Sequence, residues 1–147
     1  MITLDMRTED DAWRVVSDLE AVCTQALDAA AKIARQSGEI SLLLTGNDGI
    51  KALNKTWRGK DMPTDVLSFP ADPIDRPFLG DIAIGYGVSR RDADERGILI
   101  TQHLSHLLIH GYFHLIGHDH VDDTDATEME SLEIAALASL GWPDPYR

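Results

Sequence analysis

All six histidines of this 147-residue chain lie between positions 103 and 120, and four of them stand in the stretch HGYFHLIGHDH, His110 to His120. Imidazole nitrogens are common metal ligands and proton carriers. The spacing of these residues therefore raises two questions: whether the cluster binds a metal ion, and which of its members would hold it.

Helical spacing limits the choice. Residues four apart on an α-helix share one face and lie about 6 Å apart along the axis, so His106, His110 and His114 would form a row. The outer two are about 12 Å apart, whereas zinc–nitrogen bonds measure about 2.0–2.1 Å. One ion is therefore not expected to bind all three, and a neighbouring pair must be completed from elsewhere.

Gly117 indicates which pair that is. Glycine readily adopts the left-handed conformation that ends a helix, and the chain can then turn back toward His110 and His114. Either His118 or His120 could complete the site, and the preferred set is His110, His114 and His120 in the pattern H-x-x-x-H-x-x-G-x-x-H. Three neutral imidazoles with one open position suit catalytic zinc, so we expect one Zn²⁺ ion.

The remaining two histidines, His103 and His106, are expected to pack in the core or to support the ligands. The spacing of the proposed ligands matches that of the metzincin zinc proteases, with one difference. Those enzymes carry a glutamate, the general base, directly after the first histidine, and this chain has Gly111 there. Peptide hydrolysis is therefore not the favoured function.

A second dense stretch, NKTWRGKDMPTDVLSFP, contains Arg58. The overlapping stretch KALNKTWRGK, residues 51–60, carries four basic side chains, Arg58 among them, and no acid. A guanidinium group presents a planar fork that suits phosphate oxygens. The sequence alone favours phosphate binding no more than a local ion pair of Arg58 with Asp61 or Asp65.

Together the two stretches resemble the YbeY family of bacterial metal-dependent endoribonucleases. The family signature H-G-x-x-H-L-x-G-[YH]-D-H stands at residues 110–120, and N-x-x-x-R-x-x-D-x-P-T-D-V-L-S-F-P stands at residues 54–70. The segments LGDIAI and LGWPDPY look like family features too, so the resemblance covers residues 40–146.

This resemblance implies zinc on the three matching histidines, a catalytic arginine at Arg58, and cleavage of single-stranded RNA in ribosomal RNA maturation and ribosome quality control. The implied partners are ribosomal RNA and the ribosome or its proteins, in the cytoplasm. His118 stands where tyrosine is common in the family, which leaves open whether it joins the metal ligands. His118 and Asp119 are candidates for proton transfer, although Asp119 more readily orients a ligand histidine.

Two alternatives stay open at this point. One is a zinc hydrolase of another substrate class, such as a peptidase. The other is a non-enzymatic ribosome-associated module with a structural zinc ion. Structural zinc has four protein ligands, so a fourth ligand from His118 would favour that module.

Composition restricts the partners further. The net charge of −12 argues against indiscriminate binding to nucleic acid or to an anionic membrane, and we expect neither a DNA nor a membrane partner. Cys23 is the one cysteine, so no intrachain disulfide forms, which fits a reducing cytoplasm. The length suits one domain over residues 1–147.

The elements that must position these residues follow from local patterns. Strands are predicted at residues 1–7, 40–46, 66–69 and 79–86, where apolar residues alternate with polar ones or form short runs. Helices are predicted at 10–36, 47–57, from Ser89, at 98–117, and from Thr124 or Asp125 to Gly141. We therefore expect an α+β fold in which one small, about four-stranded mixed sheet packs against several helices, with the zinc site at the C-terminal end of the long helix.

Overall fold

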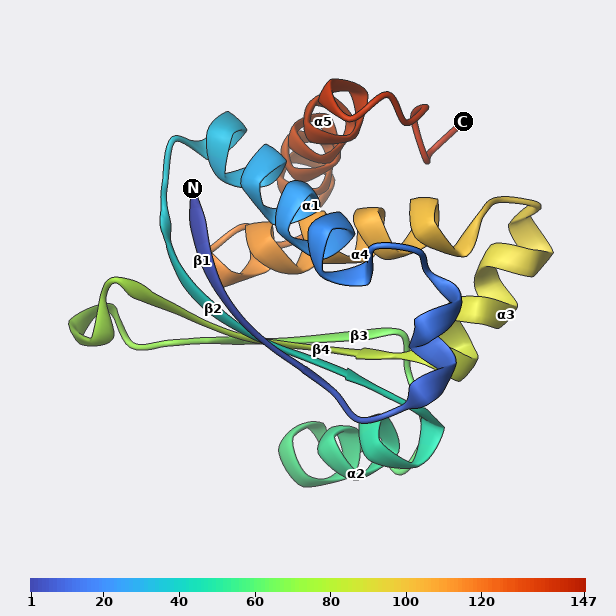
Figure 1. Ribbon diagram of the computed structural model, residues 1–147. Helices are drawn as coiled ribbons and strands as arrows, with labels where there is room; N and C mark the ends of the chain where they lie inside the picture. Colours follow the sequence, from blue (N-terminus) through green and yellow to red (C-terminus); the bar gives the residue numbers. More distant parts are fainter.

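In the computed structural model, which describes residues 1–147, four strands form one sheet in the order β1-β2-β4-β3. Strands β1 (Ile2–Thr8), β2 (Gly38–Thr45) and β4 (Phe78–Gly85) run parallel, and β3 (Val66–Pro70) pairs antiparallel with β4 at the edge. The predicted mixed sheet of four strands is confirmed, and Figure 1 shows its twist.

Alternating side chains give the sheet two different faces. In β2, Ile40, Leu42 and Leu44 are buried, and their partners across the ladder to β4 include Ile82 and Ile84. Because successive residues of a strand point to opposite faces, these side chains gather on one face. That face carries the main hydrophobic core.

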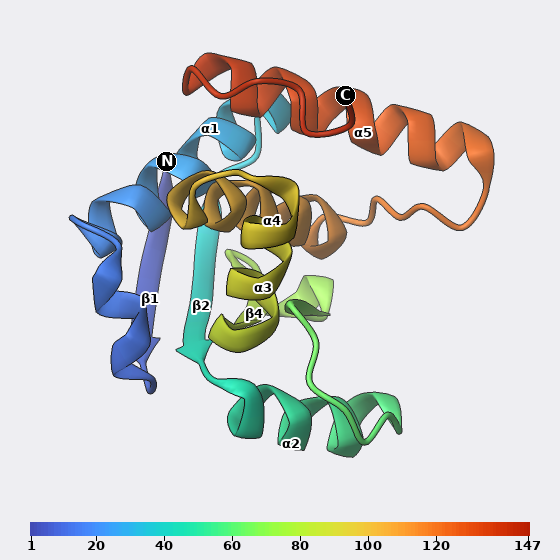
Figure 2. The same ribbon diagram turned by 90° about the vertical axis from the view of Figure 1, so that its right-hand side faces the viewer.

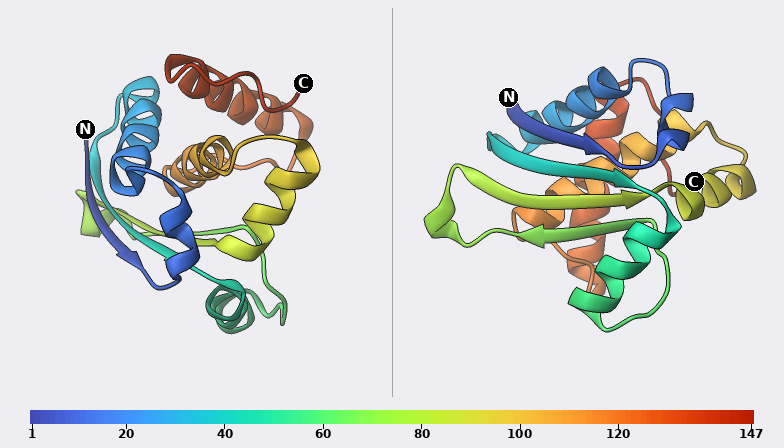
Figure 3. Two further views of the ribbon diagram at one scale, coloured as in Figure 1. Left: turned by 45° about the vertical axis from the view of Figure 1, so that its right-hand side comes forward. Right: turned by 60° about the horizontal axis from the view of Figure 1, so that its bottom comes forward.

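Helices α1 (Leu19–Ala34) and α4 (Ile100–Leu115) cover this core face, and α5 (Asp123–Ser139) packs outside them (Figures 1 and 2). Helix α3 (Tyr86–Arg96) follows β4 and leads into α4. Helix α2 (Asn47–Arg58) lies on the other side of the sheet (Figure 3), where Ile50 packs with Leu67 and Ala83 in a small second cluster. No helix combines the length and apolar character needed to cross a bilayer.

The helix predicted over residues 10–36 is wrong in its first part. A short 3₁₀ helix, Asp11–Val15, precedes α1, and Asp18 has a positive φ of 53° between them. Trp13 explains the break: its ring is buried, its indole N–H donates a 2.9 Å hydrogen bond to the carbonyl of Thr45, and Tyr86 packs edge-on against it at 5.1 Å. This distant contact overrides the local helical pattern, which contains no glycine or proline to signal the break.

Two helix starts also differ from the prediction. Ser89 lies inside α3, and its hydroxyl donates a 2.7 Å hydrogen bond to the carbonyl of Gly85. Helix α5 begins before Thr124, because the carboxylate of Asp122 caps it by accepting from the N–H of Asp125 at 2.8 Å. The residues predicted to begin these helices lie inside them, because both helices begin earlier. Helix α3 follows directly on β4, and Asp122 caps α5.

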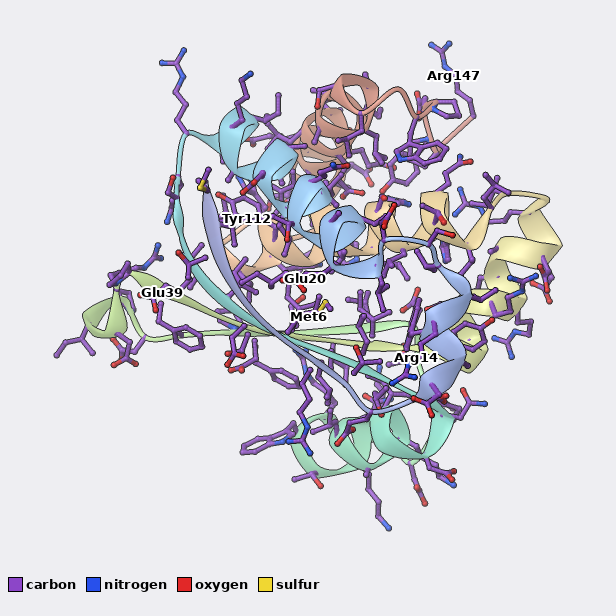
Figure 4. All side chains as sticks on the ribbon, in the orientation of Figure 1. Met6, Arg14, Glu20, Glu39, Tyr112 and Arg147 are labelled. Atoms are coloured by element: carbon purple, nitrogen blue, oxygen red, sulfur yellow. The ribbon has the colours of Figure 1, made fainter.

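Helix α4 is anchored from its sheet-facing side. Tyr112 is fully buried, and its hydroxyl donates a 2.6 Å hydrogen bond to the carbonyl of Gln36 in the α1–β2 connection (Figure 4). Its neighbour Phe113 packs edge-on at 5.3 Å. These contacts fix the rotation of α4, and they leave its opposite face free to line a cleft.

Candidate metal centre and its cleft

The outward face of α4 forms one wall of a cleft of about 970 Å³. Four histidines one turn apart lie along that wall, and β3 with its preceding loop, α3 and the segment after α4 supply the others. The wall residues from α4 are His103, His106, His110 and His114. The chain thus presents a row of imidazoles to the space that a ligand would occupy.

The turn after α4 has the geometry predicted for Gly117. Its φ is 104°, a left-handed value that favours glycine. The N–H of His118 donates to the carbonyl of Phe113 at 2.9 Å, and the N–H of Gly117 donates to that of His114 at 3.1 Å. These paired bonds close the helix and reverse the chain, so the following residues return along the cleft wall.

The reversal brings His120 beside His110 and His114. One ring nitrogen of each lies within 4.8 Å of the others. The Nε2 atoms of His110 and His114 are 3.1 Å apart, and the His120 ring centroid lies 5.6 and 5.2 Å from those of His110 and His114. The three histidines preferred from the sequence are therefore together. His118 is not part of this group, and its ring packs against Phe113 at 5.7 Å.

This donor set fits a tetrahedral metal ion such as zinc. Two nitrogens bound at about 2.0–2.1 Å with a tetrahedral angle lie about 3.3 Å apart, close to the 3.1 Å between the Nε2 atoms of His110 and His114. Burial, and then the neighbouring His110 and His120 rings, lower the pKa of His114. A neutral imidazole is the form that binds metal. His120 is exposed, which leaves one side of the group open to the cleft.

Glu133 of α5, which is not among the site residues predicted from the sequence, supports the histidines from behind. Its carboxylate is 1% exposed. It accepts from His110 Nδ1 at 3.0 Å, His106 Nε2 at 2.6 Å and the Tyr146 hydroxyl at 2.6 Å. Because a carboxylate only accepts, the proton of His110 sits on Nδ1, and the lone pair of Nε2 faces the cluster. Such a carboxylate partner fixes the tautomer and orientation of a ligand histidine.

These hydrogen bonds keep the buried carboxyl group of Glu133 ionised. Burial alone would raise the pKa of its carboxyl, but the hydrogen bonds from His106, His110 and Tyr146 outweigh burial and lower the pKa to about 2. Burial and the bond to Glu133 raise the pKa of Tyr146. At neutral pH the pair is therefore a carboxylate and a neutral phenol, which together hold two histidine rings.

A sequence pattern could have pointed to Glu133. It lies four residues after Met129 and four before Leu137, both buried. Residues four apart share a helix face, so Glu133 is an acid in the apolar row of α5. A buried acid requires a partner, and six histidines nearby in sequence were the available donors. Glu133 meets these histidines only when α5 packs on α4, and local sequence patterns do not reveal that packing.

Arg58 ends α2 at the mouth of the same cleft. Its Nη2 donates a 2.7 Å hydrogen bond to the carbonyl of Ser68, and its guanidinium lies over the Phe69 ring, 5.5 Å from the centroid. The suggested local ion pair with Asp61 or Asp65 is absent. The side chain is exposed, so its other N–H groups can reach a ligand.

The two acids near Arg58 have other partners. Asp61 pairs with Lys51 and Lys55, each at 3.9 Å. Asp65 accepts from the backbone N–H of Val66 at 2.6 Å. The loop acids thus hold the loop and the α2 lysines, and they do not neutralise Arg58.

Asp119 and His118 both line the cleft. Asp119 Oδ1 accepts from the N–H of Val121 at 3.0 Å, which shapes the loop after the turn. The histidine-orienting hydrogen bonds come from Glu133 instead. The role of Asp119 in orienting a ligand or moving a proton therefore stays a prediction.

The position that carries the general base in zinc proteases is closed here. Gly111 packs against the sheet, and a Cβ added to it would lie 3.1 Å from Ile82 Cδ1 and 3.1 Å from Ser68 Oγ. A longer side chain would point at the sheet, and Ile82 and Ser68 would have to give way to it. Position 111 therefore faces the sheet and not the cleft.

Comparisons with known proteins indicate a family for this chain. A family model described as Endoribonuclease YbeY matches residues 5–141. A protein named Endoribonuclease YbeY from Rhodopseudomonas palustris is 47% identical over 146 residues, which covers 92% of this chain and 87% of that protein. One of the same name from Bradyrhizobium sp. is 50% identical over 147 residues, with 92% and 87% covered.

A solved structure shows the same fold. The solution structure of a Thermotoga maritima protein superposes with a TM-score of 0.60 over 100% of this chain and 99% of that chain. The two sequences are 24% identical, so this likeness bears on the fold alone.

Proposed function

Because this chain belongs to the YbeY family of endoribonucleases, we propose that it is a metal-dependent endoribonuclease that cleaves single-stranded RNA during ribosomal RNA maturation. The observation that carries the proposal is one cleft lined by both a three-histidine group and Arg58. Action at the ribosome, a part in ribosome quality control and a cytoplasmic location belong to the same proposal.

In this proposal His110, His114 and His120 hold one zinc ion. Three neutral imidazoles and an open side toward the cleft favour zinc over magnesium, which prefers oxygen ligands. When bound, zinc supplies Lewis-acid chemistry to a phosphoryl oxygen and makes water more acidic. Glu133 keeps His110 in the tautomer whose Nε2 faces the ion.

Arg58 would bind the phosphate whose bond is cleaved. The Ser68 carbonyl and the Phe69 ring hold the guanidinium at the cleft, so little ordering of the side chain remains when RNA arrives. A guanidinium fork can donate two parallel hydrogen bonds to phosphate oxygens. Placed where negative charge develops, it stabilises the transition state more than the ground state.

His118 and Asp119 would provide the proton transfers. Both line the cleft, and both follow the turn that places His120. His118 has a ring nitrogen for either role, and Asp119 keeps one carboxylate oxygen beyond its bond to Val121. We assign proton transfer to this pair without dividing it between them.

The alternatives fit less well. A peptidase would need a base at position 111, where a side chain would press on Ile82 and Ser68. A purely structural zinc would be expected to have a fourth protein ligand, whereas the group contains three histidines and His120 is exposed. An open, arginine-lined site favours chemistry on a phosphodiester.

The test is cleavage of a single-stranded RNA, with casein as the competing substrate. We expect RNA cleavage that a chelator abolishes and zinc restores, and no casein hydrolysis. Arg58→Ala should lower the rate about 10²–10³-fold, the usual effect of removing one transition-state donor. Arg58→Lys should recover little, since lysine offers a point charge.

The matched control is Arg14→Ala, an exposed arginine outside the cleft that pairs with Asp11 at 3.4 Å (Figure 4). Rates are compared per folded, zinc-loaded molecule. Wild-type cleavage by Arg58→Ala would remove Arg58 from the mechanism. Casein hydrolysis without RNA cleavage would overturn the proposed function.

A further inference from the structure

A second set of polar side chains lies in the same cleft, around His103 near the start of α4. This residue is 4% exposed, yet neither of its ring nitrogens has a hydrogen-bond partner. Buried polar groups are nearly always paired. Burial lowers the pKa of His103, so its ring is neutral at pH 7 and offers a lone pair.

Two carboxylates from other elements face this ring. Asp65 precedes β3 and Asp92 lies in α3, and one oxygen of each lies within 4.8 Å of the other and of a His103 nitrogen. The hydrogen bonds of Asp65, from Val66 and Thr64, both reach Oδ1, which leaves Oδ2 without a partner. Three elements thus converge on one point.

The three donors are near one another but do not bond directly. A hydrogen bond from the ring would need about 2.7–3.2 Å, and none is present. Donor atoms around a cation at about 2.1 Å lie about 3–4.2 Å from one another, and one donor atom of each of these side chains lies within 4.8 Å of the other two. The three donors are thus near enough for their side chains to close on one ion.

The charges at this point also favour a cation. Two carboxylates supply two negative charges, and the surface pair of Asp92 with Arg91 is long, at 3.7 Å. Arg96 lines the same cleft, where its positive charge helps to lower the pKa of His103, and its Nη2 donates to the carbonyl of Pro145 at 2.7 Å. Against this guanidinium stand the two carboxylates whose oxygens lie beside the His103 ring.

We propose that Asp65, Asp92 and His103 form a second divalent-cation site, separate from the three-histidine group. Two carboxylates with one imidazole suit Mn²⁺ or Mg²⁺ better than a three-imidazole set does. His103 precedes His110 by seven residues, about 10 Å along α4. Paired catalytic metals lie about 3.5–4 Å apart, so an ion here would contact a different part of the RNA from the cleaved phosphodiester.

The experiment titrates Mn²⁺ into protein that already holds one equivalent of zinc, at pH 7 and without RNA. Free Mn²⁺ is followed by its electron paramagnetic resonance signal. Zinc stays bound to His110, His114 and His120, because it binds imidazole ligands more tightly than manganese does. We expect one further Mn²⁺ per chain with a Kd below about 1 mM, the weak end of protein cation sites.

Two variants and one control decide the outcome. Asp92→Asn and His103→Asn should each weaken Mn²⁺ binding at least about tenfold, since each removes one of three ligands. Asp94→Asn, in the same helix and paired with Arg90 at 3.3 Å, should bind as the wild type does. Asp65 is left unchanged because it also holds the backbone of Val66.

Two results would overturn the site. Absence of saturable Mn²⁺ binding would mean that only water fills the gap. An equal loss in Asp94→Asn would mean that Mn²⁺ responds to surface charge in general. Neither result involves RNA cleavage, so failure of this site leaves the proposed endoribonuclease function untouched, and the cleavage test leaves this site untouched.

Discussion

Glu133→Gln separates the charge of the buried carboxylate from its shape. Glu133 Oε1 accepts from His106 and Tyr146, and Oε2 accepts from His110. Glutamine keeps one acceptor oxygen and replaces the other with an NH₂ group. If the oxygen stays with His106 and Tyr146, the NH₂ faces His110 Nδ1 and moves the proton of that ring to Nε2, where it blocks the metal.

The size of the effect follows from these contacts. One hydrogen bond to a charged acceptor is lost at a ligand histidine, which costs about 1.5–3 kcal/mol. Loss of such a supporting partner lowers metal affinity about 10–100-fold, or about 1.4–2.7 kcal/mol. The two figures agree. We therefore expect Glu133→Gln to fold and to bind zinc about 10–100-fold more weakly than the wild type.

The assay is competition for zinc against a chelator of known affinity at pH 7.5, with folding checked by circular dichroism. Glu128→Gln is the matched control, because Glu128 lies in the same helix but is exposed. Unchanged zinc affinity in folded Glu133→Gln would refute the argument that the carboxylate sets the tautomer of His110. An equal loss in Glu128→Gln would assign the effect to overall charge.

Three further outcomes are expected. His114→Ala should lose zinc by elemental analysis whereas His106→Ala should keep it, and equal loss in both would mean that the ligand set is wrong. Gly111→Glu should lower the free energy of unfolding by on the order of 3 kcal/mol in urea, because a carboxylate is forced against the sheet, and it should gain no casein hydrolysis. Burial raises the pKa of the Cys23 thiol from 9.0 to about 12, so the contribution of Cys23 to stability is constant below pH 9 and falls by up to about 4 kcal/mol as pH rises from 9 to 12. Cys23→Ala should remove that part of the alkaline loss, which urea titrations of both proteins at pH 8 and 11 would measure. An equal fall in the free energy of unfolding in both proteins would contradict this prediction.

The histidine group was predictable because its geometry is local. His110 and His114 are one helical turn apart, and Gly117 supplies the left-handed turn that returns His120. Eleven consecutive residues contain every part of this arrangement. Their positions depend on helix periodicity and one glycine, and little on the rest of the chain.

What supports the group was not predictable, because it comes from distant elements. Glu133 lies in the next helix and Tyr146 near the C-terminus, and both reach His106 only after α5 packs on α4. The break at Asp18 has the same cause, since Trp13 bonds to Thr45 across the fold. Local patterns name candidates for such contacts but do not choose among them.

Arg58 shows why residue type and spacing left two explanations equal. An arginine three residues from Asp61 suggests an ion pair, but the αL turn at Gly59 sends the loop aside, and Lys51 and Lys55 take that acid.

The guanidinium is instead held by Ser68 and Phe69 of β3, the edge strand. The same strand packs against α4 at Gly111. One edge strand thus positions the arginine on one side of the cleft and the histidine helix on the other. Under the proposed function, the phosphate and the metal ion would bind to residues held by the same strand, so a change that shifts β3 should disturb both together.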